Sequence, residues 1–181
     1  EFPAKLVKEK LGNGASGNKT LSQPFTYTKG QLAIYSVTHS LDGFTPAALN
    51  TLLTTGSNTK ITLANPSLAP YGESAKSYLQ AQHLYDTLTA QKRIIQAENI
   101  GQAFQYAHTG SVDYGFVAQS QLTAIKATPD QFYTLAPESY PPILQDGVVI
   151  GDASVATDFS NYLRAPAGQQ YFSDAGYLAI D

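Results

Sequence analysis

The chain has 181 residues, of which 43% are hydrophobic and 14% charged, and its formal net charge is −3 at pH 7. This length suits one large domain or two small lobes with a substantial core. The acidic balance argues against a nucleic-acid-binding protein, and no apolar run approaches the roughly 18 residues that cross a membrane. Because the sequence contains no Cys, disulfides and thiolate metal sites are excluded.

The first residues predict a short amphipathic helix, with Pro3 in its first turn and Gly12 after its end. They contain no apolar core of the length found in signal peptides. Residues 12–24 are rich in Gly, Ser and Asn and predict a surface loop.

From residue 25 onward, segments typical of strands alternate with segments typical of helices. Thr45 and Pro46 fit the N-cap and first position of a helix, and Ile100, Ala103 and Phe104 recur at helical spacing. Strands are predicted over 25–36 with a turn at Lys29 and Gly30, and over 60–64, 92–97, 112–118, 131–136 and 141–150. Helices are predicted over 44–55, 71–83, 98–110, 120–129 and, in two pieces divided near Pro166, 154–177. This alternation predicts an α/β layered fold with mostly parallel strand pairing.

Two loops each follow a predicted strand and lead into a predicted helix: "ANPSLAPYGESA" from Ala64 and "QAENIGQA" from Gln96. Such loops lie at the carboxyl ends of parallel strands, where ligands bind in α/β proteins. The first turn of a helix offers N–H groups without intrahelical acceptors and a partial positive charge, which together suit an anion. Neither loop contains Lys or Arg. Every α/β protein has such junctions, so an ordinary structural loop remains an alternative to an anion site.

The stretch "ITLANPSLAPYGESAKSYL" resembles the molybdate-binding proteins of ABC transporters, whose pattern is close to "L-A-x-P-x-x-x-P-x-G-x-x-A-x-x-x-L". The stretches "ENIGQAFQYAHTGSVDYGFVAQSQL", "YPPILQDGVVI" and "FSNYLRAPAGQQYFSDAGY" resemble later blocks of the same family, in the same order and at near-equal spacing. The resemblance covers 25–177. It implies a two-lobed fold of the type II periplasmic binding proteins, with molybdate or tungstate held as an oxyanion between the lobes and with no cofactor.

The resemblance also implies which residues contact the oxyanion. The donors from the second lobe would be the backbone N–H groups of Tyr71 and Ile100, with Pro70, Asn99 and Ala118 as candidate cleft-lining residues. Some members of the family add a Tyr hydroxyl at the place of Ala118, so that contact should be missing here. No side chain would bind a metal ion directly, because molybdate binds as an oxyanion.

In the family, the first lobe supplies further donors from two early loops, and the resemblance implies that this chain begins after them. The crossovers between lobes would fall near 34–38 and 140–146. We therefore expect 38–140 to form a complete second lobe, and 1–37 with 141–181 to form a partial first lobe. An incomplete lobe would leave an unpaired sheet edge, which predicts weakened oxyanion binding and a dimer formed through this lobe.

Other candidate chemistry is sparse. His39, His83 and His108 lack the spacing of metal ligands. Asp113 and Asp146 could act as paired carboxylates, although a turn residue and a crossover residue explain them better. No nucleophile motif or Walker motif is present. The 12 Tyr could line a sugar or peptide groove, but partly exposed packing residues are the simpler interpretation.

The sequence thus predicts a non-enzymatic receptor for a tetrahedral oxyanion, which passes its ligand to an ABC transporter permease. We expect it in the periplasm, or outside the cytoplasm with a membrane anchor upstream of this chain. The first alternative is the effector-binding domain of a transcriptional regulator with the same fold. The second is an α/β enzyme, which the absence of a nucleophile–base signature disfavours.

Overall fold

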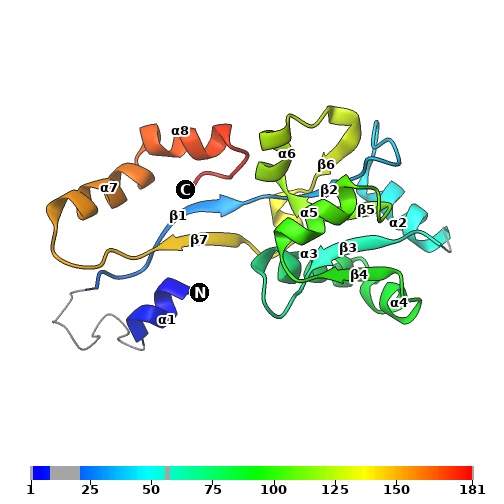
Figure 1. The fold of residues 1–181 in the computed structure, drawn as a ribbon, viewed down its shortest axis with the longest axis horizontal. Coiled ribbons are helices and arrows are strands. Elements are labelled where there is room, and N and C mark those ends of the chain that lie inside the picture. The colour runs from blue at the N-terminus through cyan, green and yellow to red at the C-terminus, as the bar shows by residue number, and fades with distance from the viewer. Residues whose placement is uncertain (1, 9–20, 56–57, 181) are drawn as a thin grey trace. The chain divides into compact units, whose positions relative to one another are not determined.

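The computed structural model describes residues 2–8, 21–55 and 58–180 of the chain, shown in Figure 1. These residues divide into two compact units, one comprising Glu1–Lys29 and Leu144–Asp181 and the other Gly30–Ile143. The lobe expected over 38–140 falls inside the second unit. That this unit corresponds to the family's second lobe is a proposal.

A five-stranded sheet forms the centre of the second unit, in the order β4-β3-β5-β2-β6. Its strands are β2 (Leu32–Tyr35), β3 (Ile61–Ala64), β4 (Ile94–Ala97), β5 (Tyr114–Ala118) and β6 (Phe132–Thr134). Strand β3 pairs in parallel with β4 and β5, whereas β2 pairs antiparallel with β5 and β6. The expectation of mostly parallel pairing is therefore wrong for this sheet. Strand β2 pairs with segments far along the chain, Leu32 opposite Ala118 for example, and no local pattern specifies the direction of such a pairing.

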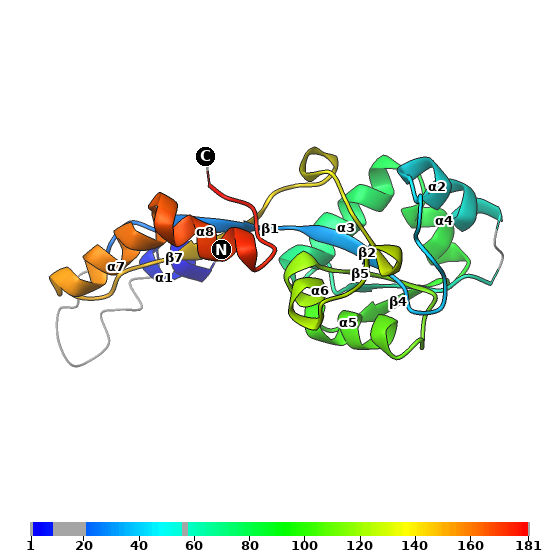
Figure 2. The same ribbon diagram turned by 90° about the horizontal axis from the view of Figure 1, so that it is seen from above.

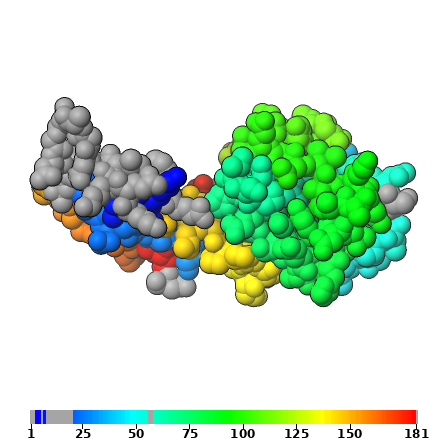
Figure 3. Space-filling view, turned by 90° about the horizontal axis from the view of Figure 1, so that it is seen from below, coloured from blue at the N-terminus to red at the C-terminus, as the bar shows by residue number. Residues whose placement is uncertain are grey.

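Helices cover both faces of this sheet (Figure 2). One face carries α2 (Pro46–Thr55), α3 (Pro70–Ala81) and α4 (Tyr85–Ala90), and the other carries α5 (Ile100–His108) and α6 (Gln119–Ile125). Because side chains alternate along a strand, Leu32 and Ile34 of β2 pack into the core on the first face, and Ala33 and Tyr35 into the core on the second. The second unit is thus a layered α/β/α fold. Figure 3 shows it from the side on which the green segments from α3 to α5 form the surface.

Local interactions explain where several helices begin and how closely they pack. Thr45 caps α2 as predicted, with the Ala48 N–H donating to Thr45 Oγ1 at 3.1 Å. Gly115 allows α5 to pack closely on β5, because a Cβ there would lie 2.7 Å from Cβ of Ala107. Two short 3-10 helices, Pro129–Gln131 and Pro137–Ser139, flank β6.

Helix α4 was not predicted from the sequence. It follows α3 closely, after His83 has adopted a left-handed conformation with φ of 57°. Its fully buried apolar residues are only Leu84 and Leu88, which lie one helical turn apart. A helix of 6 residues is too short to produce a longer periodic signal.

The first unit contains strands β1 (Phe25–Gly30) and β7 (Ile143–Gly147), which pair as a two-stranded sheet, and helices α1 (Phe2–Lys8), α7 (Ser154–Arg164) and α8 (Pro166–Asp174). The helix expected at the start of the chain is present as α1, but its predicted end at Gly12 and most of the loop expected over 12–24 lie outside the described residues. The turn expected at Lys29 and Gly30 is wrong: β1 continues through Gly30, and the chain then joins β2 in a different sheet.

Helix α7 leaves apolar surface exposed in the first unit. Val155 is 75% exposed and Phe159 60%. A groove of about 420 Å³ is lined by Phe159 together with Phe25, Tyr27 and Leu163. Within the described residues, no helix is both long and apolar enough to traverse a bilayer.

Candidate functional site

The loop between β3 and α3 is organised by Asn65. The Ser67 N–H donates to Asn65 Oδ1 at 2.9 Å, and the Leu68 and Ala69 N–H groups donate to Asn65 O at 3.1 and 2.9 Å. These bonds form a compact Asx turn that leads into Pro70, the first residue of α3. The N–H groups of Ser67, Leu68 and Ala69 are therefore occupied, and α3 begins immediately after them.

Tyr71 is the second residue of α3, and Gly72 sets how closely this first turn approaches the sheet. The Glu73 N–H is bonded to Ala69 O at 3.0 Å, so the regular helical bonding begins there. A Cβ on Gly72 would overlap the carbonyl oxygen of Ala64, the last residue of β3. Only Gly therefore fits at this place, and it holds the first turn of α3 against the end of β3.

The start of α5 is closed by a variant of the capping box, in which the Gln102 side chain bonds Glu98, the residue before the N-cap Asn99. The Gln102 N–H donates to Asn99 Oδ1 at 2.9 Å, and the Glu98 N–H donates to Gln102 Oε1 at 2.7 Å. Within the described part of the chain, the N–H groups of Ile100 and Gly101 have no hydrogen-bond acceptor. The capping box thus leaves two backbone donors of the first turn available.

The first turns of α3 and α5 lie at the same edge of the sheet. Strands β3 and β4 are parallel neighbours, and their last residues, Ala64 and Ala97, are partners in the register. Both strands lead directly into these helices, whose N-termini carry partial positive charge. No Lys or Arg occurs within 61–75 or 94–125. The edge can therefore offer neutral N–H donors to a small anion, and this chemistry needs no cationic side chain.

The residues expected to line the cleft differ in exposure. Pro70 and Asn99 are exposed, whereas Ala118, the last residue of β5, is buried. The Ala118 N–H donates to Gln121 Oε1 at 3.0 Å, so this backbone donor is already occupied. Tyr71 is half-buried, and its ring packs so closely on Gly30 that a Cβ on Gly30 would lie 2.8 Å from Tyr71 Cζ.

Sequence reasoning did not identify Gln102 or Gln121 as residues that shape this edge. The spacing of Asn99 and Gln102 is that of a capping box and could have been recognised. Gln121 occupies the equivalent third position of α6, but the N-cap is Ala118, whose side chain offers no oxygen. The usual sequence signature is therefore only half present there.

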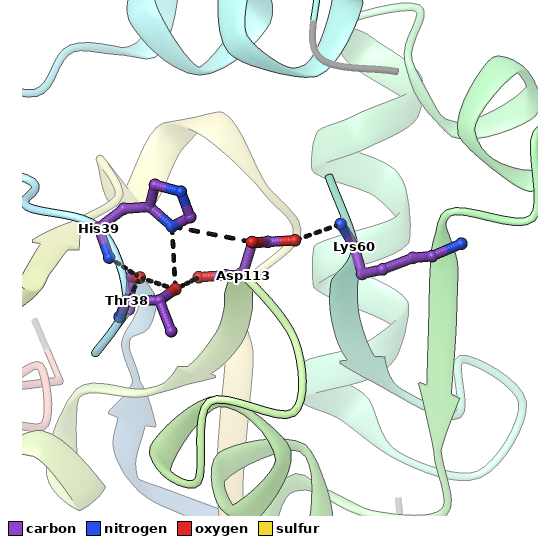
Figure 4. Close-up of polar contacts among 5 residues, drawn as sticks. Thr38, His39, Lys60 and Asp113 are labelled. Carbon is purple, nitrogen blue, oxygen red and sulfur yellow. Dashed lines mark hydrogen bonds and ion pairs between the residues drawn. The ribbon is translucent and has the colours of Figure 1, made fainter. Parts of the chain in front are cut away.

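The polar cluster around His39 lies at the opposite edge of the sheet (Figure 4). Asp113 precedes β5, and its carboxylate accepts a hydrogen bond from the Lys60 N–H at 2.7 Å and lies 3.8 Å from His39 Nδ1. Thr38 Oγ1 lies 2.9 Å from the same His39 nitrogen. Asp113 therefore joins the segments that precede β3 and β5, in agreement with its interpretation as a turn residue.

The remaining candidate groups have separate structural partners. Tyr35 Oη lies 2.7 Å from His108 Nδ1, and burial raises the pKa of this Tyr35 hydroxyl. Asp146 belongs to the first unit, where it accepts a hydrogen bond from Thr26 Oγ1 at 2.7 Å. Among the described residues, no group of three or more His, Asp or Glu side chains could hold a metal ion. The described part of the chain thus offers the sheet edge at α3 and α5 as its candidate site.

An α/β unit that directs paired helix N-termini to one edge of its sheet is a feature of ligand-binding proteins. The chain matches the model of the family described as bacterial extracellular solute-binding protein over residues 1–178, and it belongs to this family. It is 28% identical to the molybdate-binding protein ModA of Rhodobacter capsulatus and 30% identical to that of Azotobacter vinelandii, over 97% of this chain in both cases. It spans about two thirds of these relatives, 65% and 66% of their respective lengths.

A solved structure of the periplasmic molybdate-binding protein of Azotobacter vinelandii is similar to this chain, with a TM-score of 0.73 and 27% identity. The similarity covers 98% of this chain and 85% of that one. The α/β fold of the periplasmic-binding-protein type, expected from the sequence, is therefore confirmed.

Proposed function

We propose that this chain is the molybdate- or tungstate-binding part of a solute-binding protein, and that the backbone N–H groups of Tyr71 and Ile100 contact the oxyanion. The observation that carries the proposal is the placement of the α3 and α5 first turns after neighbouring parallel strands that end in register at Ala64 and Ala97. Similarity to molybdate-binding proteins along nearly the whole chain supports the same ligand class.

A set of uncharged N–H donors suits a fully deprotonated dianion. Molybdate and tungstate carry no proton at neutral pH, so every oxygen can accept a hydrogen bond from the protein. Phosphate retains a proton near pH 7, and an edge made of donors alone leaves that proton without an acceptor. Sulfate is also deprotonated, but it is smaller, so donors spaced for a larger anion would contact it less well.

The proposal extends to the partner and the compartment. The receptor would deliver the oxyanion to an ABC transporter permease from the periplasm, or from a position anchored outside the cytoplasm, without catalysis and without a cofactor. The second unit would serve as the second lobe, and the exposed apolar side chains of the first unit support a dimer formed through that unit. Nothing in the fold favours the effector domain of a regulator over the receptor.

Calorimetric titration of the chain with molybdate, tungstate, sulfate and phosphate at pH 7 tests the proposal. We expect molybdate and tungstate to bind more tightly than sulfate, and sulfate more tightly than phosphate. The order of affinities is the informative result, because it depends on donor chemistry rather than on the total number of contacts. A phosphate-first order, or no heat of binding with either metallate at millimolar concentration, would overturn the proposal.

A further inference from the structure

Gln121 connects the two helices on one face of the second unit. Its Nε2 donates to the carbonyl oxygen of Ile100 at 3.2 Å, and its Oε1 accepts from the Ala118 N–H at 3.0 Å. The two contacts require opposite ends of the amide, so a single orientation of the side chain satisfies both. Gln121 therefore joins the first turn of α6 and the end of β5 to the first turn of α5.

This connection spans β3, because the strand order places β3 between β4, which leads to α5, and β5, which leads to α6. In α5, the hydrogen bond from Gln121 ends at Ile100, whose backbone N–H is a proposed ligand donor. The Asn99 side chain caps this turn by accepting from the Gln102 N–H, and Gln121 donates to the Ile100 carbonyl. The Ile100 carbonyl belongs to the peptide that follows Ile100, and the carbonyl of the preceding peptide, Asn99 O, accepts from the Ala103 N–H at 3.0 Å. The peptides on both sides of Ile100 are thus restrained.

We propose that Gln121 is a positioning residue for the oxyanion site, which holds the peptide that follows Ile100 and so keeps the first turn of α5, with its Ile100 N–H, in place without contacting the ligand. This inference rests on the proposed function. A hydrogen bond weakens steeply when its angle falls away from linear, and the first turn of a helix otherwise frays. A site that binds through backbone donors therefore depends on the side chains that hold its peptide planes.

If Gln121 only caps α6, its replacement should leave the first turn of α5 unchanged. If Gln121 positions α5, its replacement should loosen that turn. Gln119 provides the matched control, because it lies in the same helix, and its Oε1 accepts a hydrogen bond from Thr134 Oγ1 of β6 at 2.6 Å rather than bonding α5. Gln121→Met and Gln119→Met each remove amide hydrogen bonds while keeping a side chain of similar length. Only Gln121→Met releases the Ile100 carbonyl.

Two measurements on the wild-type chain and both variants test whether Gln121 positions α5. In calorimetry with sodium molybdate, Gln121→Met should weaken binding about tenfold, while Gln119→Met stays within about twofold of the wild type. In the ligand-free protein, amide hydrogen exchange of Phe104, whose helical acceptor is the Ile100 carbonyl, should be faster in Gln121→Met than in Gln119→Met. Equal molybdate affinities of the two variants, or equal exchange of Phe104, would overturn the inference.

The exchange experiment separates this inference from the proposed function. If the wild-type chain bound no oxyanion, the proposed function would fail, while Phe104 exchange would still report whether Gln121 holds α5. If Gln121→Met does not fold, Gln121→Glu serves in the exchange measurement, because its carboxylate still accepts from Ala118 but cannot donate to Ile100. Faster Phe104 exchange in Gln121→Glu than in Gln119→Met supports the inference, and equal exchange refutes it.

Discussion

Gly72→Ala is the substitution that tests the placement of α3 most directly. The new Cβ would overlap the Ala64 carbonyl oxygen and lie 2.7 Å from the Ala64 carbonyl carbon and 2.9 Å from that of Asn65. Carbon atoms in favourable contact are about 3.5–4.0 Å apart, so the first turn of α3 must move away from β3 by roughly 0.5–1 Å. All of the colliding atoms belong to the backbone, and no side-chain rotation can relieve the contact.

The shift has consequences for both stability and binding. Overpacking of this kind costs about 1–3 kcal/mol, and the better helix propensity of Ala offsets up to about 1 kcal/mol, so the free energy of unfolding should fall by about 1–2 kcal/mol. A donor that moves by roughly 0.5–1 Å passes beyond the about 3.2 Å limit of an N–H···O hydrogen bond. Losing the Tyr71 donor to a charged acceptor should then weaken molybdate binding about tenfold or more.

Gly101→Ala is the matched control in α5. Gly101 is exposed, and the atom nearest to a Cβ there is Asn99 Oδ1 at 3.2 Å, which belongs to a side chain that can move. This variant should keep molybdate binding within about twofold and gain up to about 1 kcal/mol in the free energy of unfolding. Urea denaturation and calorimetry on both variants provide the measurements. If Gly72→Ala matched the wild type in both, α3 would not be held against β3 as described, and the placement of Tyr71 would be refuted.

Four further outcomes can be measured. Ile100→Pro removes one proposed donor at a helix position that tolerates Pro, so it should weaken molybdate binding by about 1–3 kcal/mol in calorimetry, whereas Ile100→Val should bind nearly as the wild type does; equal affinities would place the site elsewhere. Tyr78 has a buried hydroxyl without a hydrogen-bond partner among the described residues, so Tyr78→Phe should leave the free energy of unfolding in urea unchanged or raise it by about 1 kcal/mol, and a marked loss would contradict that description. Arg93→Met should lower the free energy of unfolding by about 2–3 kcal/mol, because the buried guanidinium donates to the carbonyls of Leu53 and Thr59 at 2.6 and 2.9 Å; a urea midpoint equal to that of the wild type would refute this. Burial, with a smaller effect of the neighbouring Tyr133 phenol, raises the pKa of Tyr78 above its ordinary value of 10.0, so the stability that comes from keeping this hydroxyl protonated is complete below about pH 10 and is lost as the pH rises through the raised pKa; a urea midpoint that stays constant from pH 9 to 11.5 would contradict it.

The sequence predicts most helices and strands of this chain because their signals are local. Helix α5 has periodic apolar residues, an Asn99 cap and a Gly110 after its end, and each of these acts within a few residues of the chain. Helix α4 gives no comparable signal, since Leu84 and Leu88 are its only fully buried apolar residues. The antiparallel direction of β2 is not predictable in this way, because it depends on a pairing with β5.

The candidate site shows the same division between local and distant information. The exposed N–H groups of α5 could be anticipated from the Asn99 and Gln102 spacing alone. The bond from Gln121 to Ile100 could not, because it joins residues 21 positions apart through the packing of α6 beside α5. Sequence patterns thus identify which turns could bind a ligand, and the tertiary structure identifies what orients them.

The Pro-x-Gly sequence at the start of α3 does not by itself indicate a ligand. The same sequence begins α8, where a Cβ on Gly168 would overlap the carbonyl oxygen of Tyr162 in α7. In both helices, Gly therefore permits a first turn to approach a backbone carbonyl. The difference lies in the surroundings: α8 follows α7 after the single residue Ala165, so the C-terminal carbonyls of α7 lie beside the positive end of α8.

Helix α3 has no such preceding helix, because its first turn follows a strand and the Asn65 loop. No helix directly precedes α3 in the sequence, so its positive N-terminal end does not face the negative end of a preceding helix. The same holds for α5, which follows β4 directly, and the register of β3 and β4 brings both helix starts to one edge. The proposed anion site thus depends on two helix N-termini at one edge that no directly preceding helix opposes, and displacing either one should weaken binding.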